Sequence, residues 1–302
     1  MLARNADYAI FPCGSGLVWL RAALEEIDDF PVWNLVEDLH SGVLGLRAGW
    51  RGLYVPIVGA HAQHSPEDIA NVFKQRGTWA LDTTRLLVFD RFRKIPWKMR
   101  LHFMEQAIFY LLSIPLLIIV TIPAAGVFFN RYPLSSDPAT YAVRFWGFAL
   151  SVELMLLSLA AAQAPGSLWR SRLSWIGMAP VYAKAALKAV RYGPYKKPAY
   201  KVTRKTDDYQ WYVKMVWVHW MLLLGTAAAI LVALTRDDFV TELDLGSVYW
   251  GIVAIFGLAA FLRLSWFGVD PREKLRTRFA PLLRLIGRGP DDETSEEDDD
   301  NG

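Results

Sequence analysis

The carboxyl-terminal two thirds of the chain alternates long apolar runs with short charged segments. Two runs contain no Asp, Glu, Lys or Arg, and two others contain a single charged residue each, Glu153 and Arg263. The four runs are residues 106–129, 145–163, 215–235 and 246–269. A helix needs about 20 residues to cross the hydrocarbon core of a bilayer, and an Arg near one end can reach the interface. The pattern therefore predicts four transmembrane helices.

The front of the chain, residues 1–72, has a different pattern, in which short mixed segments alternate with turn residues. Within it, Asn34 precedes Glu37 by three positions, the spacing of a capping box, and a helix is expected to end at Gly49. Leu39, Val43 and Leu46 then fall on one face. The next residues, 51–56 (RGLYVP), are typical of a short strand closed by its proline. The pattern predicts part of an α/β domain.

Asp38 falls in the first turn of this expected helix. The partial positive charge at a helix N-terminus favours an ionised carboxylate, which could act as a general base if it faces a cleft. The alternative is a simple helix-start charge without a chemical role.

Composition and charge indicate a membrane protein with a defined orientation. The chain is 53% hydrophobic with 13 Trp, more than an ordinary soluble domain carries. Lys and Arg number ten in residues 164–212 and six in 270–290, but two in 130–144 and one in 236–245. Because positive residues accumulate on the cytoplasmic side, four spans place both termini in the cytoplasm, in a multi-pass plasma-membrane protein. The start of the chain lacks the apolar run of a cleaved signal peptide.

Two cytoplasmic segments are expected to form helices in the membrane interface. In residues 168–192 the apolar and basic side chains fall largely on opposite faces, which is typical of an interfacial helix. The apolar set is Trp169, Leu173, Ile176, Leu187 and Val190, and the basic set is Arg170, Arg172, Lys184, Lys188 and Arg191. Residues 83–100 form a second candidate. The tail, residues 270–302, is basic and then acidic (DDETSEEDDD), a composition that favours solvated disorder.

Few residues are candidates for metal or redox chemistry. A single cysteine, Cys13, excludes an intramolecular disulfide and is expected to be a small buried residue. The five histidines do not form a metal-binding pattern, since His61 and His64 lack a third ligand nearby in the sequence. The basic balance is explained by a cytoplasmic membrane face and requires no nucleic acid.

Several motifs, taken in order, resemble processive family 2 glycosyltransferases, the group of cellulose, hyaluronan and chitin synthases. Val36-Glu37-Asp38 resembles the T-E-D segment of that family, and residues 11–30 (FPCGSGLVWLRAALEEIDDF) resemble the stretch that precedes it. Residues 75–79 (QRGTW) stand where the family has Q-x-x-R-W, and residues 200–205 (YKVTRK) are similar to its F-x-V-T-x-K gating loop. The resemblance extends to about Val269.

The resemblance implies roles for the matching positions. Asp38 would be the general base that deprotonates the acceptor hydroxyl, with Glu37 beside it. Gln75 and Trp79 would bind the acceptor end of the glycan, and Gly14 would allow close backbone approach. The loop would close over the nucleotide sugar, with basic residues available to its phosphates. The donor and loop residues implied are Tyr200, Lys201, Val202, Thr203, Arg204, Lys205 and Arg76.

Two departures from the family pattern stand out. Thr78 replaces the family Arg that would contact the donor diphosphate, and Arg76 or Arg85 could substitute for it. The family's D-x-D metal ligands and uridine-binding half lie upstream of the matching region, and residues 1–72 contain no D-x-D. Asp28-Asp29 is an adjacent pair expected in a turn. The resemblance thus implies Mg²⁺ or Mn²⁺ bound by residues outside this chain, and a truncated or split protein.

The expected architecture is therefore the carboxyl-terminal part of a GT-A-type α/β glycosyltransferase domain followed by four transmembrane helices with cytoplasmic interfacial helices. Its expected parts are residues 1–72 (partial transferase domain), 73–103 (Q-x-x-x-W segment and interfacial helix), 104–269 (membrane domain, with the interfacial helix 168–192 and the loop 198–206) and 270–302 (tail).

The expected function is inverting, processive transfer of sugar, with glucose expected, from a UDP-sugar to a polysaccharide that passes through the bilayer. A separate polypeptide could supply the missing half. Hyaluronan or chitin synthesis, and a non-catalytic remnant or subunit, remain alternatives, while the front segment disfavours a transporter. Glu153, an acid within a span, either contacts the moving glycan or pairs with Arg144 or His219.

Overall fold

The structure is a computed structural model in which helices are the only regular secondary structure among the described residues. It describes residues 2–59, 66, 68–132, 137, 167–196, 212–236 and 242–265, together with scattered positions between 139 and 157. The front part contains the 3-10 helix η1 (Leu2–Asp7) and the helices α1 (Arg21–Glu26), α2 (Glu37–Arg47) and α3 (Ile69–Thr84). Two short 3-10 helices follow, η2 (Arg85–Val88) and η3 (Asp90–Lys94).

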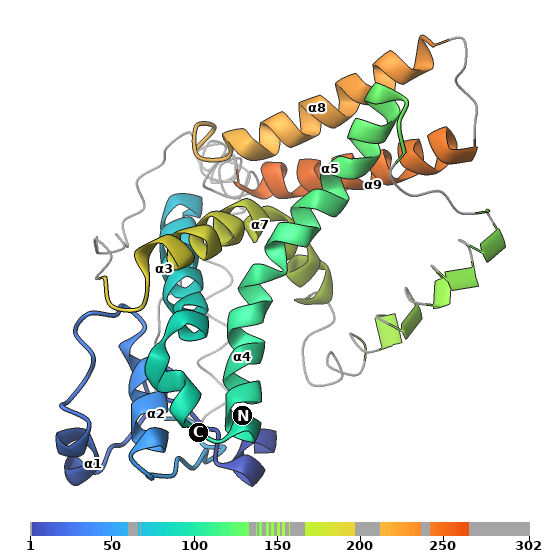
Figure 1. Cartoon of the computed structure of the whole chain (residues 1–302). Helices are drawn as coiled ribbons and strands as arrows, with labels where there is room; N and C mark the ends of the chain where they lie inside the picture. Colours follow the sequence, from blue (N-terminus) through green and yellow to red (C-terminus); the bar gives the residue numbers. More distant parts are fainter. Residues whose placement is uncertain are drawn as a thin grey trace, which may run out of the picture.

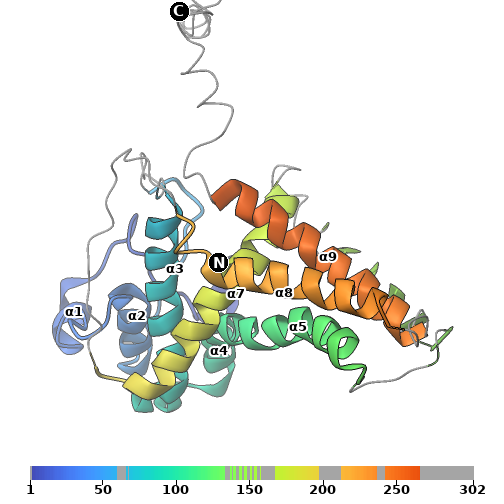
Figure 2. The ribbon, with the colours of Figure 1, turned by 90° about the horizontal axis from the view of Figure 1, so that it is seen from above.

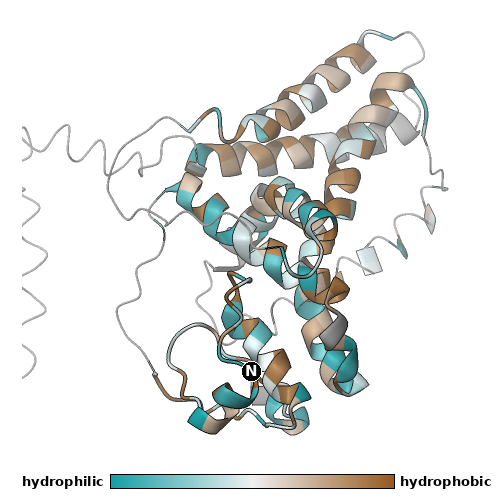
Figure 3. Cartoon of the chain, turned by 60° about the vertical axis from the view of Figure 1, so that its left-hand side comes forward, coloured by the Kyte–Doolittle hydropathy of each residue, from teal (hydrophilic) through white to brown (hydrophobic). Residues whose placement is uncertain are grey.

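A bundle of long apolar helices lies to one side of the front part (Figures 1 and 2). It consists of α5 (Ser113–Phe129), α8 (Trp217–Leu234) and α9 (Glu242–Ser265). Helix α4 (Trp97–Leu111) lies beside α3 in the front part and leads into α5, and α7 (Ser167–Tyr192) crosses between the bundle and α3. Helices α5, α8 and α9 pack against one another, and most of their ribbon is coloured brown, for hydrophobic residues, in Figure 3.

Three helical segments are long and apolar enough to cross a membrane: Trp97–Phe129, Trp217–Leu234 and Gly246–Ser265. They coincide with the predicted spans at 106–129, 215–235 and 246–269, so apolar helices of sufficient length occur where the sequence predicts them. The first is longer than predicted because α4 continues into α5 with only Leu112 between them. The fourth predicted span, residues 145–163, lies mostly outside the described residues.

Glu153 forms an ion pair with Arg172 of α7. Neither partner expected from the sequence, Arg144 or His219, takes this role. His219 is buried in α8 and contacts the Gly177 carbonyl oxygen of α7 through Nε2 at 2.6 Å. The expectation failed because Arg172 approaches from a helix whose packing cannot be read from sequence spacing.

The strand expected at residues 51–56 is wrong, and no strand occurs among the described residues of the front part. Residues 51–56 have no regular secondary structure, and no strand among the described residues pairs with them. Instead, the Asn5 side chain bonds the Tyr54 backbone on both sides, as Nδ2 donates to the carbonyl oxygen at 2.9 Å and Oδ1 accepts from the N–H at 2.8 Å.

Helix α2 forms where the sequence predicts, but it begins differently. The N-cap residue is Val36, and Asn34 is buried, accepting a hydrogen bond from the Val36 N–H at 2.7 Å instead of capping the helix. Gly49, with φ +95°, follows the helix end as predicted. The predicted apolar face is buried and joins the core with η2, η3 and α4, through residues that include Leu39, Val43, Leu46, Leu86, Phe89, Phe92 and Phe103.

The turn expected at Asp28 and Asp29 is confirmed, since both have left-handed φ values of 60° and 61°. Asp tolerates this conformation better than most residues other than glycine. The Asp29 N–H donates to the Leu24 carbonyl oxygen at 2.9 Å, which closes the end of α1.

The helix expected at residues 83–100 needs correction. These residues are not one helix, because they contain the end of α3, η2, η3 and, after Pro96, the start of α4. Residues 168–192 lie within a helix, α7, as predicted. Leu187 and Val190 are 64% and 65% exposed, while Leu173, Met178, Tyr182 and a row of alanines are buried. Helix α7 packs against α3. Its placement in the membrane interface stays a prediction.

Gly177 allows the closest approach between α7 and α9. A Cβ atom added there would overlap the ring of Phe261, whereas one added at Gly225 of α8 meets nothing within 4 Å. We expect Gly177→Ala to lower the free energy of unfolding by about 1–3 kcal/mol, the usual cost of overpacking. Gly225→Ala is the matched control and should be neutral or slightly stabilising, since Ala favours helix more than Gly does.

Thermal unfolding of the two variants in detergent micelles measures this difference. Equal stability of the two variants would contradict the close packing of α7 on α9.

Candidate functional site

Asp38 lies in the first turn of α2 with Gly14 beside it. Its Oδ1 accepts a hydrogen bond from the Leu39 N–H at 2.7 Å, and a Cβ atom at Gly14 would lie 3.4 Å from Oδ2. Gly14 has φ +81°, a conformation that suits glycine. The two residues expected at the reaction site are therefore neighbours.

The pKa of Asp38 is raised above its ordinary value. Partial burial raises it most, the Leu39 N–H lowers it, and the nearby Glu37 carboxylate raises it further. Glu37 itself is exposed. A carboxylate with a raised pKa is a stronger proton acceptor than a free one, as a general base requires.

Cys13 is exposed, so the expectation that it is a small buried residue is wrong. Shielding of the thiol raises the pKa of Cys13, and the charge of Asp38 raises it further. Cys13 directly precedes Gly14, the residue that lies beside Asp38.

Helix α3 carries the QRGTW motif and turns one face toward the entry of α2. Gln75, Trp79 and Asp82 are spaced i, i+4 and i+7 and so share that face. Asp82 contacts Leu35, at the entry of α2, through a hydrogen bond of 2.7 Å. At about 1.5 Å of rise per residue, Trp79 lies about one turn and Gln75 about two turns from Asp82, toward the N-terminus of α3. Trp79 is 38% exposed and Gln75 is half-buried.

The three residues considered for donor phosphate contact are placed very differently. Arg76 is exposed, with its guanidinium carbon 5.0 Å from the ring centre of Trp79. Thr78 donates its hydroxyl to the Lys74 carbonyl oxygen at 2.9 Å, within its own helix. Arg85 is fully buried and bonded to protein atoms, so it does not substitute for the family Arg as the sequence left open.

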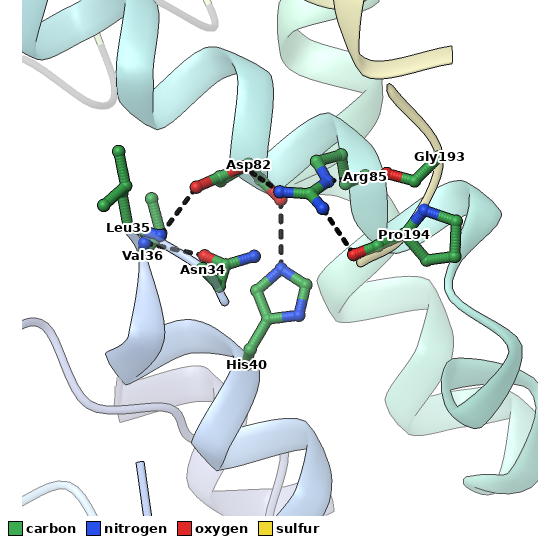
Figure 4. Close-up of polar contacts among 8 residues, drawn as sticks. All are labelled: Asn34, Leu35, Val36, His40, Asp82, Arg85, Gly193 and Pro194. Atoms are coloured by element: carbon green, nitrogen blue, oxygen red, sulfur yellow. Dashed lines mark hydrogen bonds and ion pairs between the residues drawn. The ribbon is translucent and has the colours of Figure 1, made fainter. Parts of the chain in front are cut away.

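A buried polar cluster connects α2, α3 and the exit of α7 (Figure 4). Asp82 Oδ1 pairs with Arg85 Nη1 at 2.7 Å, and neither side chain is exposed. Arg85 donates through Nε to the Gly193 carbonyl oxygen at 2.8 Å and through Nη2 to that of Pro194 at 2.6 Å. Sequence analysis missed this cluster, although a charged pair at i, i+3 before a long apolar helix was a possible signal.

His40, one turn after Val36, also contacts Asp82. Its Nε2 lies 3.0 Å from the Asp82 carbonyl oxygen. Because a carbonyl only accepts, Nε2 carries the proton in the neutral ring. Burial lowers the pKa of His40 to about 4, and the Arg85 charge lowers it too, against the opposing effect of the hydrogen bond.

The expected loop residues and metal ligands are not part of the site described above. Tyr200, Lys201, Val202, Thr203, Arg204 and Lys205 lie outside the described residues. No group of three or more His, Cys, Asp or Glu side chains in the described part of the chain could hold a metal ion. Glu37 and Asp38 alone do not supply the ligand number that Mg²⁺ or Mn²⁺ requires.

Cellulose synthases of bacteria and plants are similar to this chain. "Cellulose synthase 1" of Komagataeibacter xylinus is 28% identical over 135 residues, which is 43% of this chain and 8% of that protein. "Cellulose synthase 1 catalytic subunit (UDP-forming)" of the same organism is 26% identical over 165 residues, 54% of this chain and 21% of that protein. No protein-family model matches the chain.

A plant protein shows the same similarity. "Cellulose synthase A catalytic subunit 3 (UDP-forming)" of Arabidopsis thaliana is 27% identical over 158 residues, 47% of this chain and 14% of that protein. This chain thus spans about a fifth or less of the length of these relatives. The matches and the apolar helices support a cellulose synthase-like glycosyltransferase region of a membrane protein.

The lowered pKa of His40 predicts a pH dependence of stability. Below the ordinary pKa of 6.5 the unfolded state binds a proton that the folded state takes up only near pH 4. Stability is therefore lost as pH falls through this window, by about 1.4 kcal/mol per pH unit at most and roughly 3 kcal/mol in all.

His40→Phe removes the titrating group and should therefore flatten the dependence of the unfolding free energy on pH between about 4 and 6.5. Any effect of the substitution that is the same at every pH shifts the whole profile and leaves its slope unchanged. Unfolding of both proteins in detergent, followed at several pH values between 4 and 7, measures the difference in slope. The same slope in the variant would show that His40 is not the group responsible.

Proposed function

We propose that this chain is part of a membrane-embedded, inverting, processive glycosyltransferase that adds sugar from a UDP-sugar to a growing polysaccharide. UDP-glucose and a β-glucan are the preferred donor and product, because the relatives named above are cellulose synthases. The observation that carries the proposal is Asp38, a partly buried carboxylate with a raised pKa, beside Gly14 and tied through Leu35 to the helix of Gln75 and Trp79.

In the proposed reaction, Asp38 accepts the proton of the acceptor hydroxyl. The hydroxyl oxygen forms a bond to the anomeric carbon of the donor while the bond from that carbon to the diphosphate oxygen breaks. Attack from the opposite side inverts the anomeric configuration, and UDP leaves with the electron pair of the broken bond. General-base catalysis of this kind contributes about 10²–10⁴-fold to rate. Glu37 acts by keeping the pKa of Asp38 high.

Trp79 and Gln75 are proposed to hold the terminal sugars of the acceptor. The exposed Trp79 ring offers an apolar face to the C–H side of a pyranose, and the Gln75 amide can bond its hydroxyls. Arg76 is exposed and lies beside Trp79, so its guanidinium is proposed to contact a phosphate of the donor. The residues of the loop at 200–205 would close over the donor, as the family resemblance implies.

The donor half and its Mg²⁺ or Mn²⁺ are proposed to be supplied by polypeptide other than the residues described, either in a longer protein or in a separate chain. The front part exposes large aliphatic side chains of the kind a domain interior buries. Val18 is 99%, Val32 77%, Leu53 71%, Ile57 75% and Val58 70% exposed. Several large apolar side chains exposed on one small folded part are consistent with a contact to another part of the assembly.

The membrane placement is proposed to follow the distribution of basic residues, with both termini and α7 on the cytoplasmic side of the plasma membrane and the glycan leaving through the bundle. The described helices account for three of the four proposed spans. Residues 145–163 would supply the fourth.

Asp38→Asn should lower sugar transfer by about 10²–10⁴-fold while membrane insertion stays intact, because Asn cannot accept the acceptor proton. The measurement is UDP release and polymer formation from UDP-glucose, in membranes that also contain the donor-binding half. Asp28→Asn is the matched control, since Asn tolerates the left-handed conformation at that turn. Normal UDP release by Asp38→Asn would remove Asp38 from the reaction.

Thr78→Arg should restore the cation that the family places at this position. A hydrogen bond to a charged group contributes about 1.5–3 kcal/mol, so we expect the KM for the UDP-sugar to fall roughly tenfold to a hundredfold. Thr78→Gln is the control, because it adds length without charge. An equal effect of both variants, or none, would show that position 78 does not face the diphosphate.

A non-catalytic membrane subunit is the second candidate, favoured by Thr78 in place of the family Arg. If neither the chain nor its Thr78→Arg variant transfers sugar in the presence of the donor-binding half, this second function takes the place of the first.

A further inference from the structure

We propose that Arg85 is a positioning residue for Asp38. Through Asp82, it ties the exit of α7, residues 193–195, to the loop that enters α2, so that a displacement of either segment is transmitted to the other. The link is a property of the described contacts. Only its consequence for sugar transfer rests on the proposed function.

Arg85 uses all three guanidinium nitrogens in this link. Nη1 bonds Asp82, while Nε and Nη2 bond the carbonyl oxygens of Gly193 and Pro194, which lie more than a hundred residues away along the chain. The planar guanidinium holds these directions in one rigid group. The position of the α7 exit is therefore fixed relative to the end of α3 (Figure 4).

Asp82 completes the link on the other side. Its Oδ2 accepts the Leu35 N–H at 2.7 Å, and its carbonyl oxygen contacts His40 Nε2 at 3.0 Å. Leu35 and His40 flank Asp38 on either side in the chain. One residue of α3 therefore restrains the chain both before and after the proposed base.

Burial makes these bonds hard to replace. The side chains of Asp82 and Arg85 are both 0% exposed, so no bulk water can take over a lost partner. Trp33 lies 5.7 Å from the guanidinium carbon, and the Tyr195 ring meets the Trp33 ring edge-on at 5.2 Å. The α7 exit is thus joined to the entry of α2 by aromatic packing as well as through Arg85.

The position of the α7 exit also depends on how α7 packs against the membrane bundle and α3. Gly177 of α7 packs against Phe261 of α9, and Gly77 of α3 approaches Val181 of α7, with 3.2 Å between a Cβ built at Gly77 and Val181 Cγ1. Helix α7 is continuous from these contacts to Tyr192. A movement of α7 relative to the bundle would consequently reach Asp38 through residues 193–195 and Arg85.

Arg85→Lys tests the link with little change in charge or volume. A single ammonium can stay close to Asp82 but cannot reach both carbonyl oxygens in the geometry of the guanidinium. Hydrogen–deuterium exchange with mass spectrometry on the full chain in lipid nanodiscs follows three regions: residues 34–40, residues 192–196 and α8. Arg47→Lys, at the exposed end of α2, is the matched control.

We expect Arg85→Lys to speed exchange about tenfold or more in both residues 34–40 and residues 192–196, with α8 and the control unchanged, as local opening of a linked unit requires. Faster exchange at 192–196 alone would overturn the proposal, because the α2 entry would then be independent. A uniform increase that includes α8 would overturn it as well, since Arg85 would then only support global stability.

If Arg85→Lys does not fold, Asp82→Asn is the second variant that tests the link. The amide has one acceptor oxygen where the carboxylate has two, so it cannot accept from both Leu35 and Arg85 in the observed arrangement. The same two regions should exchange faster in this variant, and an unchanged rate at residues 34–40 would again overturn the link.

The exchange experiment involves no sugar, so its outcome is independent of the proposed function. In the assembled transferase, a positioning role predicts that Arg85→Lys lowers kcat at least tenfold while the KM for the UDP-sugar changes less than threefold. A change in KM alone would place Arg85 in donor binding instead. If Asp38→Asn is fully active but the exchange result holds, the proposed function fails and the link remains.

Discussion

The ion pair between Asp82 and Arg85 is the interaction around which the front part of the molecule is arranged. A buried pair is tolerated only when its remaining hydrogen-bonding capacity is used, because desolvation otherwise exceeds the attraction between the charges. Here the capacity is taken up by Leu35 before α2 and by Gly193 and Pro194 after α7. Three segments distant in sequence must therefore meet at this point for the pair to be stable.

Helix α3 has two faces with different chemistry, and each contacts a different part of the molecule. One face, through Phe73, Ala80 and Leu81, is buried against α7 and α9. Another carries Gln75 and Trp79 and ends at Asp82, where it meets the entry of α2. Helix α3 thus joins the apolar bundle to the front part, and it places the candidate base and the candidate sugar-binding aromatic on adjoining elements.

Much of this architecture was predictable from residue patterns. Long apolar runs with at most one charged residue predicted three of the described apolar helices, and the position of Gly49 predicted the end of α2. The place of Asp38 in the first helical turn and the left-handed turn at Asp28 and Asp29 were also predictable. Other expectations failed where the answer depended on neighbours. Residues 51–56 have the composition of a strand, yet no strand among the described residues pairs with them, and Cys13 is exposed although it was expected to be buried.

The sequence by itself determined the apolar spans, the end of the helix that carries Asp38, and the resemblance to cellulose synthases, because each depends on local composition or on short motifs in order. Only the tertiary structure decided that Arg85 is buried and structural, that Cys13 is exposed, and that Glu153 pairs with Arg172. The physical reason is that solvation, and with it the charge state and partners of a polar group, depends on atoms from distant parts of the chain.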